Sequence, residues 1–235
     1  MNKDKFQISI IIPVLNEEES IEKILVSLKK QASTAQLIKE VIIVDGGSTD
    51  QTTTIAKEQG ATVITSAKGR AKQMNAGAKI ATAELLYFLH VDTFPPKNYD
   101  LLILNAVTKN NAAGCFTMVF DTDHLLLNFF AWFSKFNYRI CRGGDQSLFL
   151  TKSLFNTLNG FNEHYKIYED NEIIERIYKK TDFVVLKEKV TTSARRYEEV
   201  GVYKLQYYFG IIHLKKRLGA SPEKLYAYYR KKITA

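Results

Sequence analysis

Short apolar runs alternate with amphipathic segments through the first half of the chain. Residues 8 to 15 (ISIIIPVL) form a continuous apolar run of strand length, which is typical of a parallel strand covered on both faces. Ile21, Ile24 and Leu28 then recur at helical spacing and predict an amphipathic helix. The pattern therefore begins with a strand, a turn and a helix.

The same order repeats along the chain. VIIVD, ATVIT and ELLYFLHVD predict three more strands, and helices are expected after VIIVD and at RAKQMNAGAKIA. This alternation predicts right-handed crossovers and a mostly parallel twisted sheet flanked by helices, the Rossmann-like α/β class. Two capping boxes are expected at the helix starts. Asn16 with Glu19 would form the first, and Ser48 with Gln51 the second.

The rhythm changes after Thr93, although no repeat or low-complexity linker marks a domain boundary. We expect a helix near 98 to 109, strands at GCFTMVF, SLFLT and DFVVLK, a short helix ending at Gly160, and a helix from about Asn171. An aromatic-rich segment covers 124 to 140 and belongs either to an acceptor groove or to the core. Thr93 therefore separates two halves of one domain.

Polar side chains stand where the predicted strands end. Asn16 and Glu17 follow the first strand, Asp45 ends the second, and Asp92 ends the fourth. In open parallel sheets, ligands bind beyond the carboxyl ends of the strands, so these side chains are expected to face one crevice. Taken singly, Asn16 could also be a plain helix cap, and so could Ser48. A carboxylate at the end of a branched apolar strand has no such role.

Composition limits the class of protein. The 235 residues are 46% hydrophobic, enough for a sizeable core, and no apolar run approaches the ~18 residues of a membrane-spanning helix. The N-terminus does not resemble a cleavable signal, so a cytoplasmic location is the default expectation. Cys115 and Cys141 lack metal-ligand spacing and are expected to be core thiols.

The formal net charge of +8 lies mostly in the tail, where residues 201 to 235 hold eight basic side chains and one acid. Tyrosines alternate with these charges along two predicted helices. The tail either lies on an anionic bilayer or packs on the core as two solvated helices. A nonenzymatic nucleic-acid-binding module is a further alternative, but such a module would spread basic residues over a core face. We therefore expect no nucleic acid partner.

Common phosphate and hydrolase motifs are missing from the sequence. It has no G-x-G-x-x-G after the first strand, no G-x-x-x-x-G-K-[ST] and no G-x-S-x-G. These absences disfavour dinucleotide oxidoreductases, P-loop NTPases and serine hydrolases. A nucleotidyltransferase remains an alternative, although the glycine-rich phosphate loop that it needs is absent.

Seven stretches, in this order, resemble the motifs of glycosyltransferase family 2: SIIIPVLNEEESI, VIIVDGGSTDQT, AKGRAKQMNAGA, LYFLHVDT, GGDQSLF, GFNEHYKIYED and TSARRYEEVG. The resemblance is greatest to the short soluble members with LHVDT and GDQ. It implies a GT-A fold that transfers a sugar from a UDP- or GDP-linked donor to a hydroxyl acceptor. The basic, tyrosine-rich tail adds the hypothesis that this acceptor is lipid-linked. Residues 1–200 would form the GT-A domain, with a nucleotide-binding half at 1–93 and an acceptor and catalytic half at 94–200; residues 201–235 would form the C-terminal helices.

The resemblance also assigns donor-binding residues. Asp45 matches the carboxylate that accepts a hydrogen bond from the base, and uracil and guanine both offer a ring N–H. Arg195 and Arg196 match one late basic motif. The two side chains are adjacent, so they need not both point into the site. The remaining matches to nucleotide, phosphate and sugar contacts are Pro13, Asn16, Glu17, Gly69, Arg70, Asn75, Gly144, Asp145 and Gln146. Taken from the residue alone, Arg70 has a surface cation as its less favoured alternative.

The chain departs from the family at its metal motif. His90-Val91-Asp92 stands where the family has D-x-D, so Asp92 is expected to bind a divalent ion, Mn or Mg, with His90 in place of the first carboxylate. His90 has two alternatives, a hydrogen bond to ribose or simple packing.

The catalytic pair is expected at Glu169 and Asp170, which match the family's E-D motif at a helix start. Asp170 is predicted to be the base that takes the acceptor's proton during transfer with inversion, and Glu169 to order the site. From the residue alone, Asp170 could also be an acid that stabilises a helix N-terminus.

Overall fold

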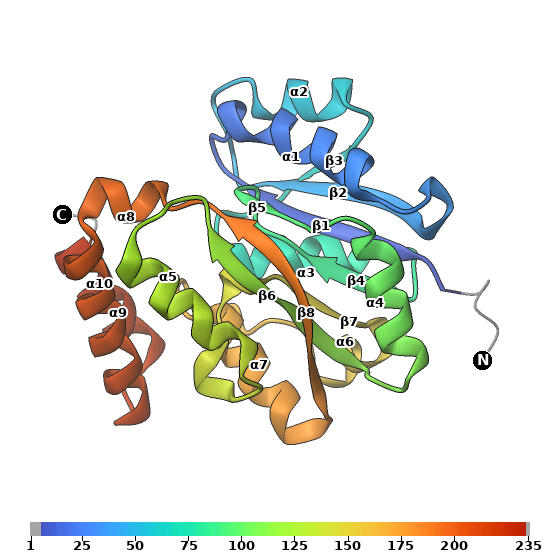
Figure 1. The fold of residues 1–235 in the computed structure, drawn as a ribbon. Coiled ribbons are helices and arrows are strands. Elements are labelled where there is room, and N and C mark those ends of the chain that lie inside the picture. The colour runs from blue at the N-terminus through green and yellow to red at the C-terminus, as the bar shows by residue number, and fades with distance from the viewer. Residues whose placement is uncertain (1–5, 234–235) are drawn as a thin grey trace.

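A computed structural model describes residues 6–233. Its centre is an eight-stranded sheet with the strand order β3-β2-β1-β4-β7-β6-β8-β5 (Figure 1). The strands are β1 (Ile8–Val14), β2 (Ile38–Asp45), β3 (Thr62–Thr65), β4 (Leu85–Phe88), β5 (Thr93–Phe94), β6 (Ala113–Phe120), β7 (Leu148–Thr151) and β8 (Phe183–Thr192). The sheet confirms the α/β class, and each strand found was expected except the two-residue β5.

Parallel pairing joins β3, β2, β1 and β4, as the alternating pattern predicts. The second half is mixed, because β7 runs antiparallel to both β4 and β6, whereas β6 and β8 are parallel. β5 pairs antiparallel with the end of β8 and closes the far edge. Four of the seven neighbouring pairs are therefore parallel.

Helices cover both faces of this sheet (Figure 1). They are α1 (Glu18–Gln31), α2 (Thr52–Glu58), α3 (Arg70–Ile80), α4 (Tyr99–Thr108), α5 (Leu125–Trp132), α6 (Lys152–Thr157), α7 (Glu169–Lys180), α8 (Arg195–Val200), α9 (Val202–Arg217) and α10 (Pro222–Ile233). Short 3-10 turns include η2 (Ala35–Leu37), η3 (Phe133–Lys135), η4 (Arg139–Cys141) and η5 (Gly144–Gln146).

The two faces of the sheet bury separate apolar clusters. In β1, Ile10 and Ile12 face the cluster that contains α1, α4 and α5, whereas Ile11 faces the cluster that contains α3, α6 and α7. Alternate side chains of a strand point to opposite faces, so a continuous apolar run is needed where helices cover both.

Both predicted capping boxes are wrong. α1 begins at Glu18 without a side-chain cap, and Asn16 adopts a left-handed backbone with φ of 54°. Its Oδ1 instead accepts a hydrogen bond from the backbone N of Thr49 at 2.8 Å. α2 begins only at Thr52, whose backbone N donates to Asp50 Oδ1 at 3.0 Å. The polar residues at both helix starts therefore tie two loops together.

The C-terminal helices pack on the core, which is one of the two arrangements that the sequence predicts for the tail. Leu205 and Ile212 of α9 and Leu225 of α10 are buried in the cluster shared with α5. No helix in residues 6–233 is long and apolar enough to cross a bilayer.

Candidate active site

A cleft of about 490 Å³ opens at the carboxyl ends of β1 and β4. β4 ends at Phe88, two residues before His90, so the HVD stretch forms a turn at the rim instead of the strand end that the sequence predicts. Seven predicted site residues line this cleft: Pro13, Glu17, Arg70, His90, Asp92, Arg195 and Arg196. The strand-end rule therefore located the cleft.

One wall consists of the loop after β1, which is fastened to the loop after β2. The backbone N of Asn16 donates to Ser48 Oγ, and that of Glu17 donates to Thr52 Oγ1, each at 2.8 Å. These bonds hold Glu17 at the cleft. Burial, and to a smaller extent the charge of Asp92, raises the pKa of Glu17, although Arg195 opposes the shift.

The two acids of the predicted catalytic pair lie beside two residues of the cleft lining, Arg70 and His90. His90 Nε2 lies 3.5 Å from Asp170 Oδ2, and Arg70 Nη1 lies 3.9 Å from Glu169 Oε1. The Arg70 side chain is half exposed, whereas that of Glu169 is almost fully buried. Each acid of the pair thus has its own cationic neighbour.

The pKa values of the two acids are shifted in opposite directions. Burial and the neighbouring charge of Asp170 raise the pKa of Glu169, and its buried Oε2 has no hydrogen-bond partner in the described residues. Burial also acts to raise the pKa of Asp170, but the contact with His90 outweighs it and the pKa is lowered. Burial acts to lower the pKa of His90, as does Arg70, yet Asp170 and Asp92 leave it raised. Asp170 is therefore a carboxylate beside an imidazole that readily holds a proton.

Gly144 of η5 packs directly against this pair. A Cβ at position 144 would collide with Asp170 Oδ2 and would lie 3.0 Å from His90 Cε1. Asp145 is exposed beside it, within the electrostatic reach of His90 and Asp92. The GDQ stretch therefore meets the HVD and YED stretches at one place.

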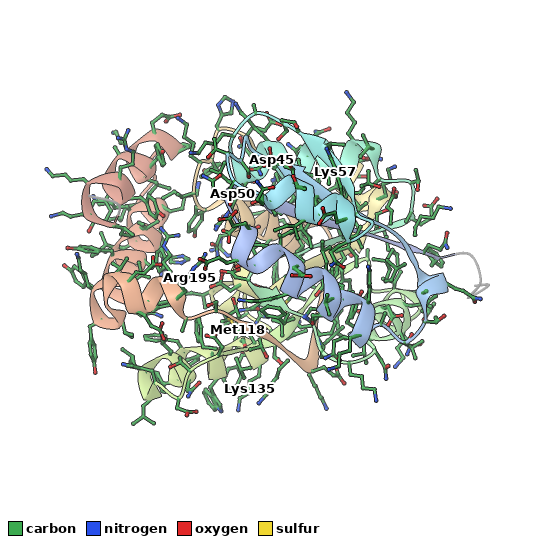
Figure 2. All side chains as sticks on the ribbon, turned by 90° about the horizontal axis from the view of Figure 1, so that it is seen from above. Asp45, Asp50, Lys57, Met118, Lys135 and Arg195 are labelled. Atoms are coloured by element: carbon green, nitrogen blue, oxygen red, sulfur yellow. The ribbon has the colours of Figure 1, made fainter. Side chains whose placement is uncertain are left out.

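Two arginines of α8 close the cleft from the C-terminal side. Arg195 Nη2 lies 3.5 Å from Glu17 Oε2, and Figure 2 shows Arg195 between the C-terminal helices and the N-terminal half of the chain. Arg196 also lines the cleft, where its guanidinium stacks over the Tyr229 ring with 5.2 Å to the centroid. Both arginines, and not one alone, thus reach the cleft.

Some predicted residues lie outside the cleft lining. The Asn75 amide clips α3 to the 161–163 loop, because it donates to Phe161 O and Glu163 Oε1 and accepts from Phe161 N. Gln146 turns into the core, where it donates to Cys141 O at 2.6 Å and accepts from Cys115 Sγ. In these contacts both amides serve the fold.

Seven further predicted residues are also outside the cleft lining: Glu169, Asp170, Gly144, Asp145, Asp45, Asn16 and Gly69. The Asp45 carboxylate is buried and accepts hydrogen bonds from the backbone N of Gly47 and of Ser48, each at 3.0 Å. Asn16 lines a smaller hollow of about 120 Å³ on the outer side of Glu17. Gly69 caps α3 with φ of 135°, a conformation that favours glycine, and so sets Arg70 as the first helical residue.

Sequence reasoning missed Gln73, which lines the cleft and bridges two strands. Its Nε2 donates to the carbonyls of Val14 and Val44, both at 2.8 Å. Gln73 lies three residues after Arg70 on the same face of α3, and this spacing was the available signal.

The cleft residues could hold a divalent cation only if a bound substrate supplied further oxygen ligands. Among residues 6–233, no three His, Cys, Asp or Glu side chains are grouped to hold a metal ion. Asp92 supplies one carboxylate at the cleft, and Mg²⁺ at nucleotide sites uses one or two carboxylates with phosphate oxygens from the substrate. This donor set suits a metal bound with a diphosphate.

Known proteins resemble both the sequence and the fold. A 63-residue stretch is 40% identical to glucosyl-3-phosphoglycerate synthase of Petrotoga mobilis, covering 26% of this chain and 19% of that relative. S. aureus TarS 1-349 in complex with UDP superposes with a TM-score of 0.67 at 21% identity, over 80% of this chain and 60% of that one. The chain therefore spans less than two thirds of each of these two proteins.

A mannosyltransferase of Pyrobaculum calidifontis, in complex with GDP-Man and Mn²⁺, superposes with a TM-score of 0.67 at 16% identity, over 98% of this chain and 68% of that one. Identities this low support the GT-A fold alone. The family model described as Glycosyl transferase family 2 matches residues 9–158, which is most of the α/β domain. The chain belongs to glycosyl transferase family 2.

Proposed function

We propose that the chain transfers a sugar from a UDP- or GDP-linked donor to a hydroxyl of an acceptor, with inversion and with a divalent cation. The observation that supports it most is a cleft lined by Asp92, Arg195 and Arg196 together with Arg70 and His90, the two residues that lie beside Glu169 and Asp170. Neighbours solved with UDP, UDP-GlcNAc and GDP-Man support a nucleotide-sugar donor, and two of them contain Mn²⁺.

In this proposal the acceptor oxygen forms a bond to the anomeric carbon while the bond from that carbon to the diphosphate oxygen breaks. The acceptor's proton passes to Asp170, and the nucleoside diphosphate leaves with the electron pair. His90 keeps Asp170 ionised and orients it for this step. A divalent cation held by Asp92 would offset charge on the leaving diphosphate.

Arg70, Arg195 and Arg196 would bind the phosphates, because guanidinium groups offer forked donors to phosphate oxygens. Arg195 pairs with Glu17 at a partly exposed contact that a diphosphate could displace. Gln73, Pro13 and the loop after β1 would form the floor below the nucleotide. Asp45 stays a proposed contact to the base, although its carboxylate is already bonded to its own loop.

A donor screen tests the proposal. The chain is incubated with UDP- and GDP-linked sugars, with Mn²⁺, Mg²⁺ or EDTA, and release of nucleoside diphosphate is followed. Thermal stabilisation by UDP and GDP, with and without Mn²⁺, reports binding independently of turnover. Asp92→Asn should weaken metal-dependent stabilisation by the diphosphate, whereas Asp182→Asn, an exposed acid beyond the end of α7, should not.

Stabilisation by neither diphosphate, together with no turnover of any donor, would contradict the proposal. Nucleoside triphosphates in the same screen test the nucleotidyltransferase alternative, and the family match argues against a nonenzymatic nucleic-acid-binding module. A lipid-linked acceptor and a cytoplasmic location stay predictions.

A further inference from the structure

α5 is apolar on the side that faces away from the core. Leu125, Phe129, Trp132 and Phe133 follow at helical spacing and are 86%, 55%, 50% and 37% exposed. Leu127 and Ala131, on the other side of the helix, are buried in the core. A surface helix normally presents polar residues to water, so this arrangement calls for a partner.

The exposed apolar residues extend beyond α5. Of the fourteen large apolar side chains exposed in residues 6–233, seven lie between Leu125 and Ile140. The His124 ring, directly before α5, packs edge-on against the Tyr203 ring of α9, with 6.1 Å between the ring centroids. We define the aromatic face by its exposed members: Leu125, Phe129, Phe130, Trp132, Phe133, Tyr138, Ile140, Tyr203 and Tyr207.

The two segments that carry the aromatic face contain basic side chains and no acid, and the exposed acids Asp121 and Asp123 stand just before α5. Residues 124–142 and 202–217, which carry the face, contain no aspartate or glutamate. Lys135 lies with Nζ 3.6 Å from the centroid of the Trp132 ring, at the α5 side of the molecule in Figure 2. Lys204 is exposed on the first turn of α9. Arg139 pairs with Glu175 and adds no net charge.

We propose that the aromatic face docks on an anionic lipid bilayer. Aromatic side chains are favoured at the headgroup level, and neighbouring lysines are attracted to anionic headgroups. A second copy of the chain is a poorer partner, because two faces that carry cations without acids repel each other. Aromatic rings beside basic side chains are also the composition of helices that lie in the membrane interface.

The aromatic face is joined to the cleft through the segment before α5. Asp121 Oδ1 accepts a hydrogen bond from the backbone N of Ala194 at 2.6 Å, directly before Arg195 and Arg196. The Phe120 ring packs edge-on against Tyr197 of α8 at 5.3 Å. Docking would thus bring the C-terminal wall of the cleft near the bilayer. Only the reason for docking, which is access to a lipid-linked acceptor, rests on the proposed function.

The single tryptophan of the chain provides the test, because Trp132 lies in the aromatic face. Its emission is recorded with vesicles of phosphatidylcholine and with vesicles of equal parts phosphatidylcholine and phosphatidylglycerol. The expected result is a blue shift with the anionic vesicles, quenching by brominated lipid, and weaker binding at high salt. The double variant Leu125→Ser, Phe129→Ser keeps the tryptophan and should bind about tenfold more weakly. Val26→Ser, an exposed apolar residue of α1, is the matched control and should bind as the native chain does.

Three results would overturn the proposal: no shift with anionic vesicles, equal binding to both vesicles, or a blue shift without lipid that grows with protein concentration. The last would identify a second copy as the partner. The vesicle assay contains no nucleotide sugar, so it is independent of transferase activity. Lipid binding by a chain that transfers no sugar would contradict the proposed function and would still support docking by the aromatic face.

Discussion

His90 Nε2 lies 3.5 Å from Asp170 Oδ2, so the residue in the first position of the expected metal motif faces the expected base. We propose that this chain divides two tasks, holding a cation and positioning the base, between Asp92 and His90. Both residues line the cleft; a cation with its diphosphate would bind at Asp92, and His90 lies beside Asp170 of the proposed catalytic pair. This arrangement gives a physical reason for a histidine where the family has an aspartate.

His90→Asp should lower activity although it restores the D-x-D pattern. A carboxylate at position 90 would face Asp170 Oδ2 and raise the pKa of Asp170 by like-charge repulsion. Asp170 would also lose the imidazole that orients it, so we expect kcat to fall about tenfold or more, with donor binding little changed. Steady-state kinetics with Mn²⁺ titrations check this expectation. Equal or higher kcat together with tighter Mn²⁺ activation would instead assign His90 to the metal.

Asp170→Asn should remove the base and keep the shape of the site. General base catalysis contributes about a hundredfold to ten-thousandfold, so kcat should fall by that range while KM for the donor changes little. The exposed Asp182→Asn carries the same chemical change away from the cleft and should retain native kcat. If Asp170→Asn keeps full turnover, the base lies elsewhere in the cleft.

Local apolar patterns predicted nearly all of the fold. Burial on both faces forces a continuous apolar run in β1, and helical spacing reports the buried stripe of α1. The helix starts were not predictable in this way. Asn16 bonds to Thr49 and Glu17 to Thr52, more than thirty residues away, and such contacts exist only after β1 and β2 have paired.

The site was predicted less completely than the fold. Parallel strand ends meet at one edge, which placed Asp92 correctly at the cleft rim although its strand ends earlier. Motif matching could not say where an amide side chain points. Asn75 and Gln146 both turn to backbone carbonyls, because a buried amide must satisfy its own donors and acceptors.

Glu40→Gln should destabilise the sheet in a pH-dependent way. Glu40 Oε1 accepts hydrogen bonds from Ser9 Oγ at 2.6 Å and from Thr82 N at 2.7 Å. Burial acts to raise the pKa of Glu40, but these bonds lower it below its ordinary value of 4.5. The Glu40 carboxylate therefore stabilises the fold at pH values above 4.5. This stabilisation is lost as the pH falls through the pKa of Glu40 in the folded state.

Urea unfolding at neutral pH should show a loss of about 1–3 kcal/mol for Glu40→Gln, which shrinks in acid. The control Glu84→Gln changes an exposed acid in the turn between α3 and β4, which also holds Thr82, and should change the free energy of unfolding little at any pH. A difference between Glu40→Gln and the native chain that is constant down to acid pH would contradict the role of the charge.

Gly144→Ala should impair turnover without unfolding the chain. The added methyl group would push Asp170 and His90 apart, and a misplacement of about 1 Å in a catalytic group can lower the rate about a hundredfold. Gly143→Ala is a matched control one residue away, because its Cβ would have no atom within 4 Å and its backbone is extended. We expect native kcat for Gly143→Ala, a strongly reduced kcat for Gly144→Ala, and similar melting temperatures for both. Equal kcat values would show that the contact of η5 with the His90–Asp170 pair has no part in turnover.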